Sequence, residues 1–116
     1  MEKLKFRPRV TFNADLKRLG RLDPTIVDEV RAAIEMLLET GTLPDEYGDY
    51  SLQRRLAGYR EFHAHDTPQG ELPSDINDVL VIWYRERNDL VAVGVRIGSH
   101  ERLFPHQNRS KKYRKD

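Results

Sequence analysis

The residues best suited to chemistry gather in one stretch near the C-terminal end, VAVGVRIGSHERLF at positions 91–104. Its first half alternates, so the valines and the isoleucine should face a core, while the small residues and Arg96 should face an open side. His100 and Phe104 follow this strand at a spacing that can return both towards Arg96. A cation, a titratable imidazole and an aromatic ring beside a smooth sheet face would suit a phosphate and a base.

A second group of titratable side chains stands in the run HAHD at positions 63–66. On a strand, His63 and His65 would share one face, and that spacing can chelate a metal ion. A metal site needs a third or fourth ligand, however, and no recognisable set completes this pair, so we predict no metal site. Surface histidines at a strand end are a plausible interpretation for His65, and less so for His63.

Single charged residues in the predicted strands have both a structural and a functional interpretation. Arg60 and Arg96 can each bind a ligand or form a structural ion pair. Strict alternation places Arg60 and His63 on opposite faces unless a bulge intervenes. Asp78 opens an apolar strand, where burial would raise its pKa towards a role in proton transfer; it can equally be a carboxylate at a turn.

The elements that must position these residues begin with a strand and two helices. Alternating apolar residues predict a strand over residues 6–12, with its proline at a sheet edge. Asn13 is expected to cap a short helix that breaks near Gly20. Asp23 caps the clearest helix in the sequence, which has a proline in its first turn, an apolar stripe and Gly41 at its end. We predict that this second helix is scaffold.

Three further strands complete the predicted sheet. They cover residues 56–64, residues 78–85, which should be buried on both faces, and the alternating stretch after a turn at positions 88 and 89. The polar insertion at residues 67–77 contains two prolines and a glycine, and is expected to be an exposed and mobile hairpin loop.

The order of these elements predicts an α+β fold, in which the N-terminal strand and two helices pack on one face of an antiparallel sheet of about four strands. The uncovered face carries Arg96 and is where a site would lie. We expect residues 1–104 to form a single domain and residues 105–116 to form a basic C-terminal tail. Lys111 and Lys112 lie in this tail, which would be a solvated end or would add salt-dependent affinity for phosphates.

Composition limits the class of protein. The chain has 116 residues, enough for one modest core, and no cysteine, which excludes disulfides and thiolate chemistry. No apolar run approaches the roughly 18 residues of a membrane span, and the basic start lacks the apolar core of a secretory signal. We therefore expect a cytoplasmic protein. The net charge of +1 divides into +5 over residues 1–22, −7 over residues 23–53 and +3 over residues 54–116, which suggests one surface for an anionic partner.

Three runs, taken together, resemble a known family. The runs GYREFHAHD at 58–66, DVLVIWY at 78–84 and RIGSHERLF at 96–104 resemble the YafQ branch of the RelE-like toxins of bacterial type II toxin–antitoxin systems, within the RelE/ParE superfamily. The earlier segments DLKRL and LPDEYGDYSLQ fit the same pattern, so the likeness covers nearly all of residues 12–104. The resemblance implies a RelE-like fold.

The resemblance also implies an activity and its partners. Toxins of this branch are messenger-RNA endonucleases that act at the ribosomal A site and need no metal or other cofactor. The 2′-hydroxyl of the RNA attacks its own adjacent phosphate, leaving a 2′,3′-cyclic phosphate and a 5′-hydroxyl. A cognate antitoxin of the RelB or DinJ kind would neutralise the toxin, and operator DNA would be bound only through the antitoxin complex. No membrane partner is implied.

By motif match, the resemblance assigns roles to five residues. His63 and His100 carry over as the acid–base histidines, with Asp78 as their carboxylate partner, and the match leaves open which group is acid and which is base. Arg96 carries over as the cation that stabilises the phosphorane, and Phe104 as a stacking or positioning ring.

Five residues are candidate contacts to RNA: Arg60, Tyr50, Phe104, Lys111 and Lys112. Tyr50 stands where members of the family often have a histidine, and a phenol, which titrates at about pH 10, is a poorer acid–base group. Because the polar insertion separates His63 from Asp78, Asp66 competes with Asp78 for the carboxylate role.

Three other functions are compatible with these residues. The first is a noncatalytic RNA- or ribosome-binding protein that uses Arg96, the aromatic residues and the basic tail. The second is a RelE-like fold that only binds its antitoxin and acts with it as a DNA-bound co-repressor. The third, and the weakest, is a metal hydrolase built on His63 and His65.

Overall fold

The computed structural model describes residues 3–86 and 90–105. The elements, including two short 3-10 helices labelled η, are β1 Lys5–Pro8, α1 Val10–Leu22, α2 Pro24–Thr40, η1 Asp45–Tyr47, β2 Tyr50–Ser51, η2 Arg54–Leu56, β3 Arg60–His65, β4 Val79–Arg85, β5 Val91–Gly98 and α3 His100–Leu103. Within the two described ranges, no helix combines the length and the apolar character that a bilayer crossing requires.

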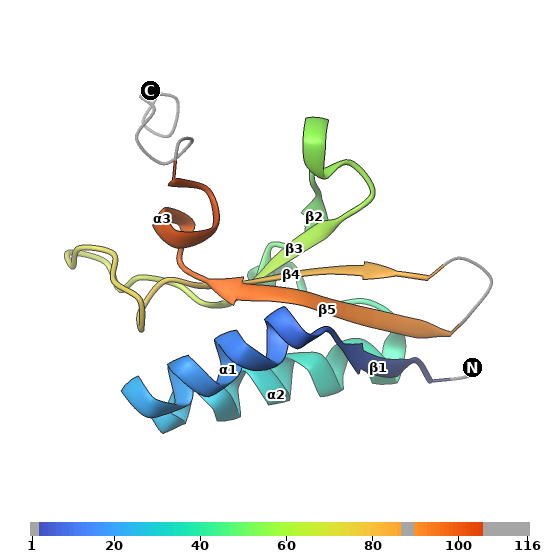
Figure 1. Cartoon of the computed structure of the whole chain (residues 1–116), viewed down its shortest axis with the longest axis horizontal. Helices are drawn as coiled ribbons and strands as arrows, with labels where there is room; N and C mark the ends of the chain where they lie inside the picture. The colour runs from blue at the N-terminus through green and yellow to red at the C-terminus, as the bar shows by residue number, and fades with distance from the viewer. Residues whose placement is uncertain (1–2, 87–89, 106–116) are drawn as a thin grey trace.

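One five-stranded sheet organises the chain, in the order β1-β5-β4-β3-β2 (Figure 1). Strands β2 to β5 pair antiparallel, whereas β1 joins the edge parallel to β5. Helices α1 and α2 cover one face, here called the helical face, while α3 and β2 rise from the opposite, open face. The predicted α+β architecture is confirmed, with a fifth short strand and one parallel edge pair.

The first strand is shorter than predicted, because residues 6–12 divide between a strand and a helix. β1 ends at Pro8, on the edge of the sheet as expected, and α1 begins at Val10, which is 84% exposed. Phe12 fills the core from α1, where its ring meets that of Phe6 edge-on with centroids 5.2 Å apart. The expected strand over this whole segment was wrong because Phe12 belongs to a helical period and not to the alternation before it.

The predicted boundaries of the first helix were also wrong. Arg9 is the N-cap residue, so Asn13 lies inside α1, and the helix continues through Gly20 to Leu22. A Cβ atom at Gly20 would lie 3.1 Å from Cγ2 of Val27 in α2. The glycine therefore marks the close approach of two helices and not a helix break.

Helix α2 begins and ends where the sequence predicts. Asp23 is its N-cap, and Asp23 Oδ1 accepts the backbone N–H of Thr25 at 3.0 Å. Gly41 ends the helix with a left-handed φ of +82°, a conformation that glycine adopts without strain. Five buried side chains hold the helix against the sheet: Ile26, Val30, Ala33, Ile34 and Leu37.

A bulge in β5 changes which of its residues face the helices. The strand pairs with β4 through Gly94 and then through Arg96, which leaves Val95 as an extra residue. Ala92 and Ile97 join the core of the helical face, whereas Val95 packs on the open face. The expectation of one continuous valine–isoleucine face was wrong because alternation does not survive an inserted residue.

A second register shift, in β3, separates two histidines. His63 pairs with Leu80 and His65 pairs with Val79, so the intervening residue is unpaired. His63 stays on the open face, whereas His65 turns to the helical face and its Nδ1 lies 2.7 Å from Oε1 of Glu29 in α2. The predicted shared face was therefore wrong, and His63 and His65 do not form a pair that could chelate a metal ion.

Strand β4 is confirmed as the central strand, with its first five residues buried. The predicted turn at Asn88 and Asp89 lies outside the described residues. Leu80 and Ile82 of β4 form the floor of a small apolar cluster on the open face, and this cluster also contains Phe104. The open face is therefore partly covered, and the covered part is where α3 sits.

The closest packing at a glycine of the sheet is at Gly94, and it allows a test of the core. A Cβ atom there would lie 2.5 Å from Phe6 Cζ and 2.8 Å from Phe12 Cδ2. Both rings would have to move, so Gly94→Ala should lower the free energy of unfolding by about 1–3 kcal/mol. Urea unfolding measures this loss against Gly20→Ala, whose added methyl meets only Val27. A Gly94→Ala protein as stable as wild type would contradict this packing.

Candidate active site

The open face carries a cluster of titratable side chains. Glu61 and His63 project from β3 two residues apart, and His100 begins α3 just beyond the end of β5. A carboxylate oxygen of Glu61 and a ring nitrogen of each histidine all lie within 4.8 Å of one another. The two imidazoles meet edge-on with centroids 5.6 Å apart. We call these three residues the Glu61–His63–His100 cluster.

Glu61 is the most deeply buried member, with 2% of its surface exposed. It pairs across the strands with Tyr50, and its Oε2 lies 3.6 Å from His63 Nε2. Burial works to raise the pKa of Glu61, but interactions with His63 and with the Tyr50 hydroxyl outweigh it, so the pKa lies below its ordinary value. The site therefore holds a buried negative charge.

His63 lies between two carboxylates. Its Nε2 faces Glu61, and its Nδ1 donates to Asp66 Oδ1 at 2.7 Å. Glu61, the larger cause, and Asp66 together raise the pKa of His63 to about 9, against the opposing effect of burial. His63 is therefore an imidazolium cation at neutral pH.

His100 is oriented by Asp78. Asp78 Oδ2 accepts the His100 backbone N–H at 2.8 Å, and both carboxylate oxygens lie 3.0 Å from His100 Nδ1. Burial works to raise the pKa of Asp78, but these hydrogen bonds, with the charge of His63, hold it below its ordinary value. The raised pKa expected for Asp78 was wrong because this aspartate is hydrogen-bonded as well as buried. Since an ionised carboxylate only accepts, Nδ1 carries the proton of the neutral ring and Nε2 carries its lone pair.

Asp66 and Asp78, the two candidates for the carboxylate role, each have a histidine partner in the structure. Asp66 binds His63, whereas Asp78 binds His100. The polar insertion between them therefore does not replace one aspartate by the other. Each histidine of the cluster has its own carboxylate, and Glu61 is a third one that lies on the far side of the His63 ring from Asp66.

The insertion at residues 67–77 is an exposed loop, as predicted, but its own hydrogen bonds give it a defined shape. Asn77 Oδ1 accepts from the Thr67 hydroxyl at 3.1 Å and from the Ser74 backbone N–H at 2.7 Å. The Asn77 side-chain N–H donates to the carbonyl of Leu72 at 3.0 Å. These bonds fix the path of the loop immediately before β4.

From this loop, Asp75 reaches the helical turn that carries His100. Asp75 Oδ1 accepts from Ser99 Oγ at 3.3 Å, and Oδ2 accepts from Arg102 Nη2 at 3.0 Å. Ser99 caps α3 by accepting the backbone N–H of Arg102 at 3.1 Å. An isolated helical turn is unstable in water. The contacts from Asp75 and Asp78 therefore set the position of His100.

Removing the Asp75 contacts should loosen α3. Asp75→Ala is expected to speed amide hydrogen exchange in residues 100–103 and to lower the free energy of unfolding by about 1 kcal/mol, because two hydrogen bonds are lost at a half-exposed site. Glu101→Gln is the matched control, since it removes one negative charge from the same turn. Exchange by nuclear magnetic resonance measures the effect, and equal rates in the two variants would show that Asp75 does not hold α3.

Arg96 of β5 is held by an ion pair with Asp15 of α1. It lies opposite Ile82, in the same row across the sheet as Glu61. Its Nε donates to Asp15 Oδ2 at 2.6 Å and its Nη2 to Oδ1 at 3.3 Å, while Asp15 also accepts the backbone N–H of Ile97. This two-point contact fixes the guanidinium, and 40% of the Arg96 side chain stays exposed.

Arg60 is not brought to the cluster. Its Nε donates to Asp49 Oδ1 at 3.2 Å and its Nη1 to Ser51 Oγ at 2.9 Å. It stands three residues before His63 in the same strand, so alternation sends the two side chains to opposite faces, as expected. Its surroundings are those of a structural ion pair.

The other expected RNA contacts have different outcomes. Tyr50 stands beside the cluster, through its pairing with Glu61. Phe104 is only 8% exposed, and its ring packs on the apolar cluster of the open face, which leaves little of the ring accessible to a base. Lys111 and Lys112 lie outside the described residues.

The sequence interpretation missed Glu61, although a signal was present. Glu61 stands two residues before His63 on a predicted strand, so alternation alone places both on one face. The role of Asp75 had no such signal, because its contact to Ser99 joins a loop and a helix 24 residues apart.

The Glu61–His63–His100 cluster is also the set of side chains that can hold a metal ion, within residues 3–86 and 90–105. A carboxylate and two imidazoles are ligands that Zn²⁺ and Cu²⁺ accept. A metal ion must displace the proton of His63, whose pKa is raised to about 9, and this proton opposes metal binding at neutral pH.

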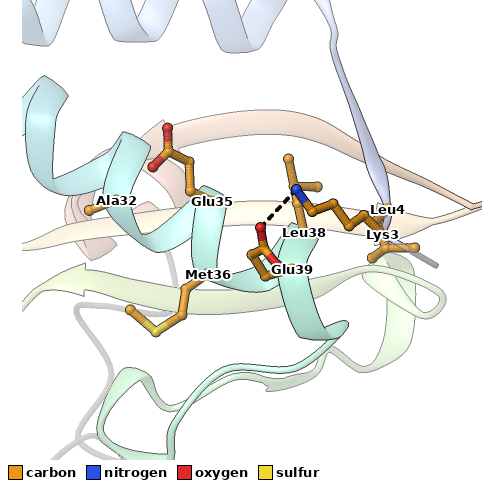
Figure 2. Close-up of a pocket in the computed structure, with 7 residues that line it drawn as sticks. All are labelled: Lys3, Leu4, Ala32, Glu35, Met36, Leu38 and Glu39. Carbon is orange, nitrogen blue, oxygen red and sulfur yellow. Dashed lines mark ion pairs between the residues drawn. The ribbon is translucent and has the colours of Figure 1, made fainter. Parts of the chain in front are cut away.

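A hollow of about 680 Å³ lies away from the Glu61–His63–His100 cluster, between the start of β1 and α2 (Figure 2). Its charged groups are Glu35 and an ion pair in which Lys3 Nζ lies 2.9 Å from Glu39 Oε2. It has neither a histidine nor an arginine in its lining. The hollow therefore lacks the groups for proton transfer that meet on the open face.

The chemistry that the Glu61–His63–His100 cluster supports is general acid–base catalysis. His63 can give a proton, His100 can take one at Nε2, and Arg96 is a fixed cation in the same row across the sheet as Glu61. These three functions match the breakdown of a phosphodiester, which needs one proton removed, one proton supplied and a negative charge stabilised.

Comparison with known proteins identifies the family of the chain. The family described as "Bacterial toxin of type II toxin-antitoxin system, YafQ" matches residues 4–105. Among solved structures, YafQ from E. coli strain BL21(DE3) is 23% identical with a TM-score of 0.63, covering 88% of this chain and 99% of that one. The E. coli DinJ–YafQ toxin–antitoxin complex gives 21% identity and a TM-score of 0.65, over 88% and 98% of the two chains. A metal-bound toxin from Helicobacter pylori gives 25% and 0.60, over 87% and 99%.

No similar sequence was found among curated proteins. The family match nevertheless extends over both runs that carry the cluster, since it begins before β1 and ends just after Phe104. The chain therefore belongs to the YafQ family of bacterial toxins of type II toxin–antitoxin systems.

Proposed function

We propose that this toxin is an endoribonuclease that cleaves messenger RNA in the ribosomal A site by metal-independent acid–base catalysis. The observation that carries the proposal is the convergence of Glu61, His63 and His100 on the open face, with a carboxylate hydrogen-bonded to the ring of each histidine. Such a cluster places two titratable rings close together, and cleavage by a neighbouring hydroxyl requires one group that removes a proton and another that supplies one.

The proposed reaction uses the RNA's own 2′-hydroxyl as the nucleophile. A base removes the 2′-hydroxyl proton, and the 2′-oxygen attacks the adjacent phosphorus. The bond from phosphorus to the 5′-oxygen breaks, and an acid protonates the leaving oxygen. The products are a 2′,3′-cyclic phosphate and a 5′-hydroxyl, so that every proton and electron pair is accounted for without an external reactant.

The two histidines differ in a way that suggests their roles. His63 is held protonated by Glu61 and Asp66, with a pKa of about 9, which suits the acid that serves the leaving oxygen. His100 has Nδ1 on Asp78, so its Nε2 suits the base that takes the 2′-hydroxyl proton. Asp78 is then the residue that orients the base.

Three other residues complete the proposed site. Arg96 is the cation that stabilises the phosphorane, and Asp15 holds its guanidinium in place. Tyr50 supports the Glu61 carboxylate, so it helps keep His63 protonated. Phe104 anchors the turn that carries His100. We further propose that residues 1–104 act as the catalytic domain and that Lys111 and Lys112 in the basic tail add affinity for RNA phosphates.

The partner proposed for control of the toxin is an antitoxin of the DinJ kind. Support comes from the E. coli relative, which was solved as a DinJ–YafQ complex. Operator DNA would be reached only through that complex, since the toxin's own exposed cations are proposed to serve RNA.

A bound metal ion would occupy the groups that the proposed reaction needs. The relative from H. pylori is described as a metal-bound toxin, and Glu61, His63 and His100 would be the ligands here. A metal ion there would supply Lewis-acid chemistry. Because the proton on His63 opposes metal binding at neutral pH, proton transfer by the side chains themselves is the function that the cluster supports better.

Cleavage in a reconstituted translation reaction tests the proposal. Purified toxin, freed of antitoxin and shown to be folded, is added to ribosomes that carry a defined messenger, either untreated or after treatment with EDTA that is then removed. We expect cuts within codons of the translated region, at the same rate with both preparations. Loss of cutting after the EDTA treatment, with restoration by Zn²⁺ added back to the toxin, would move the function to a metal hydrolase. Salt-dependent RNA binding without cutting would make the protein an RNA-binding member of the family.

A further inference from the structure

A second hollow lies on the open side of the sheet, beside the cluster. It measures about 540 Å³ and lies between η2 and the end of α3. Its lining comes from two segments, Gln53 to Leu56 around η2 and Leu103 to Pro105 at the end of α3. The leucines of this lining continue into the open-face cluster on Leu80 and Ile82. The hollow therefore has an apolar floor and a cationic rim.

The two arginines of this rim have no carboxylate partner among the described residues. Other arginines of the described residues do: Arg60 pairs with Asp49, Arg96 with Asp15 and Arg102 with Asp75. Arg54 and Arg55 are exposed, and no ion pair or side-chain hydrogen bond within residues 3–86 and 90–105 engages their guanidinium groups. Two unengaged guanidinium groups beside a hollow favour an anionic ligand with a planar surface.

The backbone at Arg54 strengthens this inference. Its φ of +59° is the only positive value at a non-glycine residue in the described ranges. A residue with a Cβ atom is strained in this left-handed conformation, and glycine would adopt it at lower cost. Strain of this kind is commonly stored at functional sites. An arginine at this position gives up stability and presents its charge to the hollow.

The hollow lies one helical turn away from the proposed reaction. α3 begins with His100, and its last residue and cap, Leu103 and Phe104, line the hollow. On the other side, η2 follows β2, whose Tyr50 pairs with Glu61. An extended ligand that passes the Glu61–His63–His100 cluster along the open face therefore reaches this hollow with its neighbouring unit.

We propose that this hollow is a subsite for an RNA nucleotide that flanks the cleaved bond. Arg54 and Arg55 bind its phosphate and stack on its base, and the apolar floor of Leu56 and Leu103 covers the other side of the base. The proposal rests on the proposed nuclease function and extends it, since the subsite would set which nucleotide is preferred next to the cut.

The test compares two variants of the rim with one matched control. Arg54→Gly removes a guanidinium and releases the strained φ, Arg55→Gln removes the other, and Arg21→Gln removes an exposed arginine from α1 on the opposite face. Cleavage on programmed ribosomes gives kcat and KM at several salt concentrations, and thermal unfolding gives Tm.

We expect Arg54→Gly to raise Tm by a few degrees while raising KM about tenfold, with kcat little changed. Arg55→Gln should raise KM similarly, and each variant should reduce the salt dependence of KM by about one charge. The preference for the nucleotide beside the cut should also weaken. A variant that is more stable and yet binds RNA less well cannot be explained by damage to the fold.

Two results would overturn the subsite. In the first, both rim variants behave like Arg21→Gln in KM and in cut positions. In the second, they cut normally but bind the antitoxin more weakly, which would assign the rim to an acidic segment of that protein. If wild type does not cut RNA at all, the nuclease proposal fails, and the subsite is still decided by titrating a short RNA oligonucleotide into wild type and the rim variants. Equal affinities would then overturn it, and weaker binding by the variants would support it.

Discussion

Replacing His100 by glutamine should lower the rate of RNA cleavage by a factor of about 10²–10⁴ without unfolding the protein. Glutamine keeps a polar group of similar length that can still contact Asp78, so the turn of α3 should remain in place. It cannot take a proton at the position of Nε2. The loss should therefore appear in kcat and leave KM nearly unchanged.

His65→Gln is the matched control for this variant. His65 lies on the same short strand as His63 but turns to the helical face, where it contacts Glu29. Its replacement should leave the cleavage rate within about twofold of wild type, because it touches none of the proposed reacting groups. Single-turnover cleavage on programmed ribosomes measures both variants. Equal rates for His100→Gln and wild type would show that His100 has no part in the reaction, and the catalytic role would then fall to His63 and Asp66.

Asp78→Asn should lower the rate in the same direction by about tenfold to a hundredfold, because asparagine can donate to Nδ1 and so favours the wrong tautomer of His100.

The cleavage rate should fall as the pH rises through about 9, the pKa of His63. Above that pH His63 loses the proton that it is proposed to give to the leaving oxygen. Glu61→Gln should move this decline to lower pH by one unit or more, because Glu61 is the largest cause of the raised pKa. The measurement is a pH–rate profile at saturating substrate. A decline at the same pH in both proteins would contradict the assignment of His63 as the acid.

The same titration makes a separate contribution to stability. Because the pKa of His63 is raised on folding, its ion pairs stabilise the folded protein fully below about pH 6.5, and this contribution is lost as the pH rises through about 9. One pKa unit corresponds to about 1.4 kcal/mol, so the contribution is at most about 3 kcal/mol. The difference in unfolding free energy between wild type and His63→Gln should therefore shrink over that interval.

The sequence predicted the parts of the fold that depend on local signals. Helix α2 has an aspartate cap, a proline in the first turn and a glycine at the end, and each of these acts within a few residues of itself. The central strand β4 is apolar along most of its length, so no register had to be known. The order of elements then limited the architecture to helices on one face of a sheet.

The errors share one physical cause, which is that alternation was extended through places where the backbone departs from it. The extra residue Val95 in β5 and the shift between His63 and His65 in β3 each reverse the face of the next residues in the strand. A bulge depends on pairing with a neighbouring strand, so the sequence of one strand does not reveal it. The predicted strand over residues 6–12 was wrong for a related reason, because one apolar residue such as Phe12 can end an alternating series or begin a helical one.

Sequence motifs and strand alternation predicted part of the candidate site, and the contacts between distant segments could not be predicted from them. His63, His100 and Asp78 meet as expected, but the use of both aspartates, one for each histidine, required the path of the 67–77 loop. Arg96 was expected to face a phosphate or to form an ion pair, and the ion pair with Asp15 is present. Asp15 comes from α1, 81 residues earlier in the chain, so no spacing rule connects the two.

The measurement that tests the central claim most directly is cleavage of a messenger with a single 2′-deoxy nucleotide on the 5′ side of the mapped cut. If Glu61, His63 and His100 catalyse attack by the 2′-hydroxyl, that site should not be cut, while neighbouring unmodified sites are cut as before and end in a 2′,3′-cyclic phosphate. Cutting of the 2′-deoxy site at the normal rate, with a 5′-phosphate on the downstream product, would contradict the account. It would mean that water is the nucleophile and that the cluster serves a different reaction.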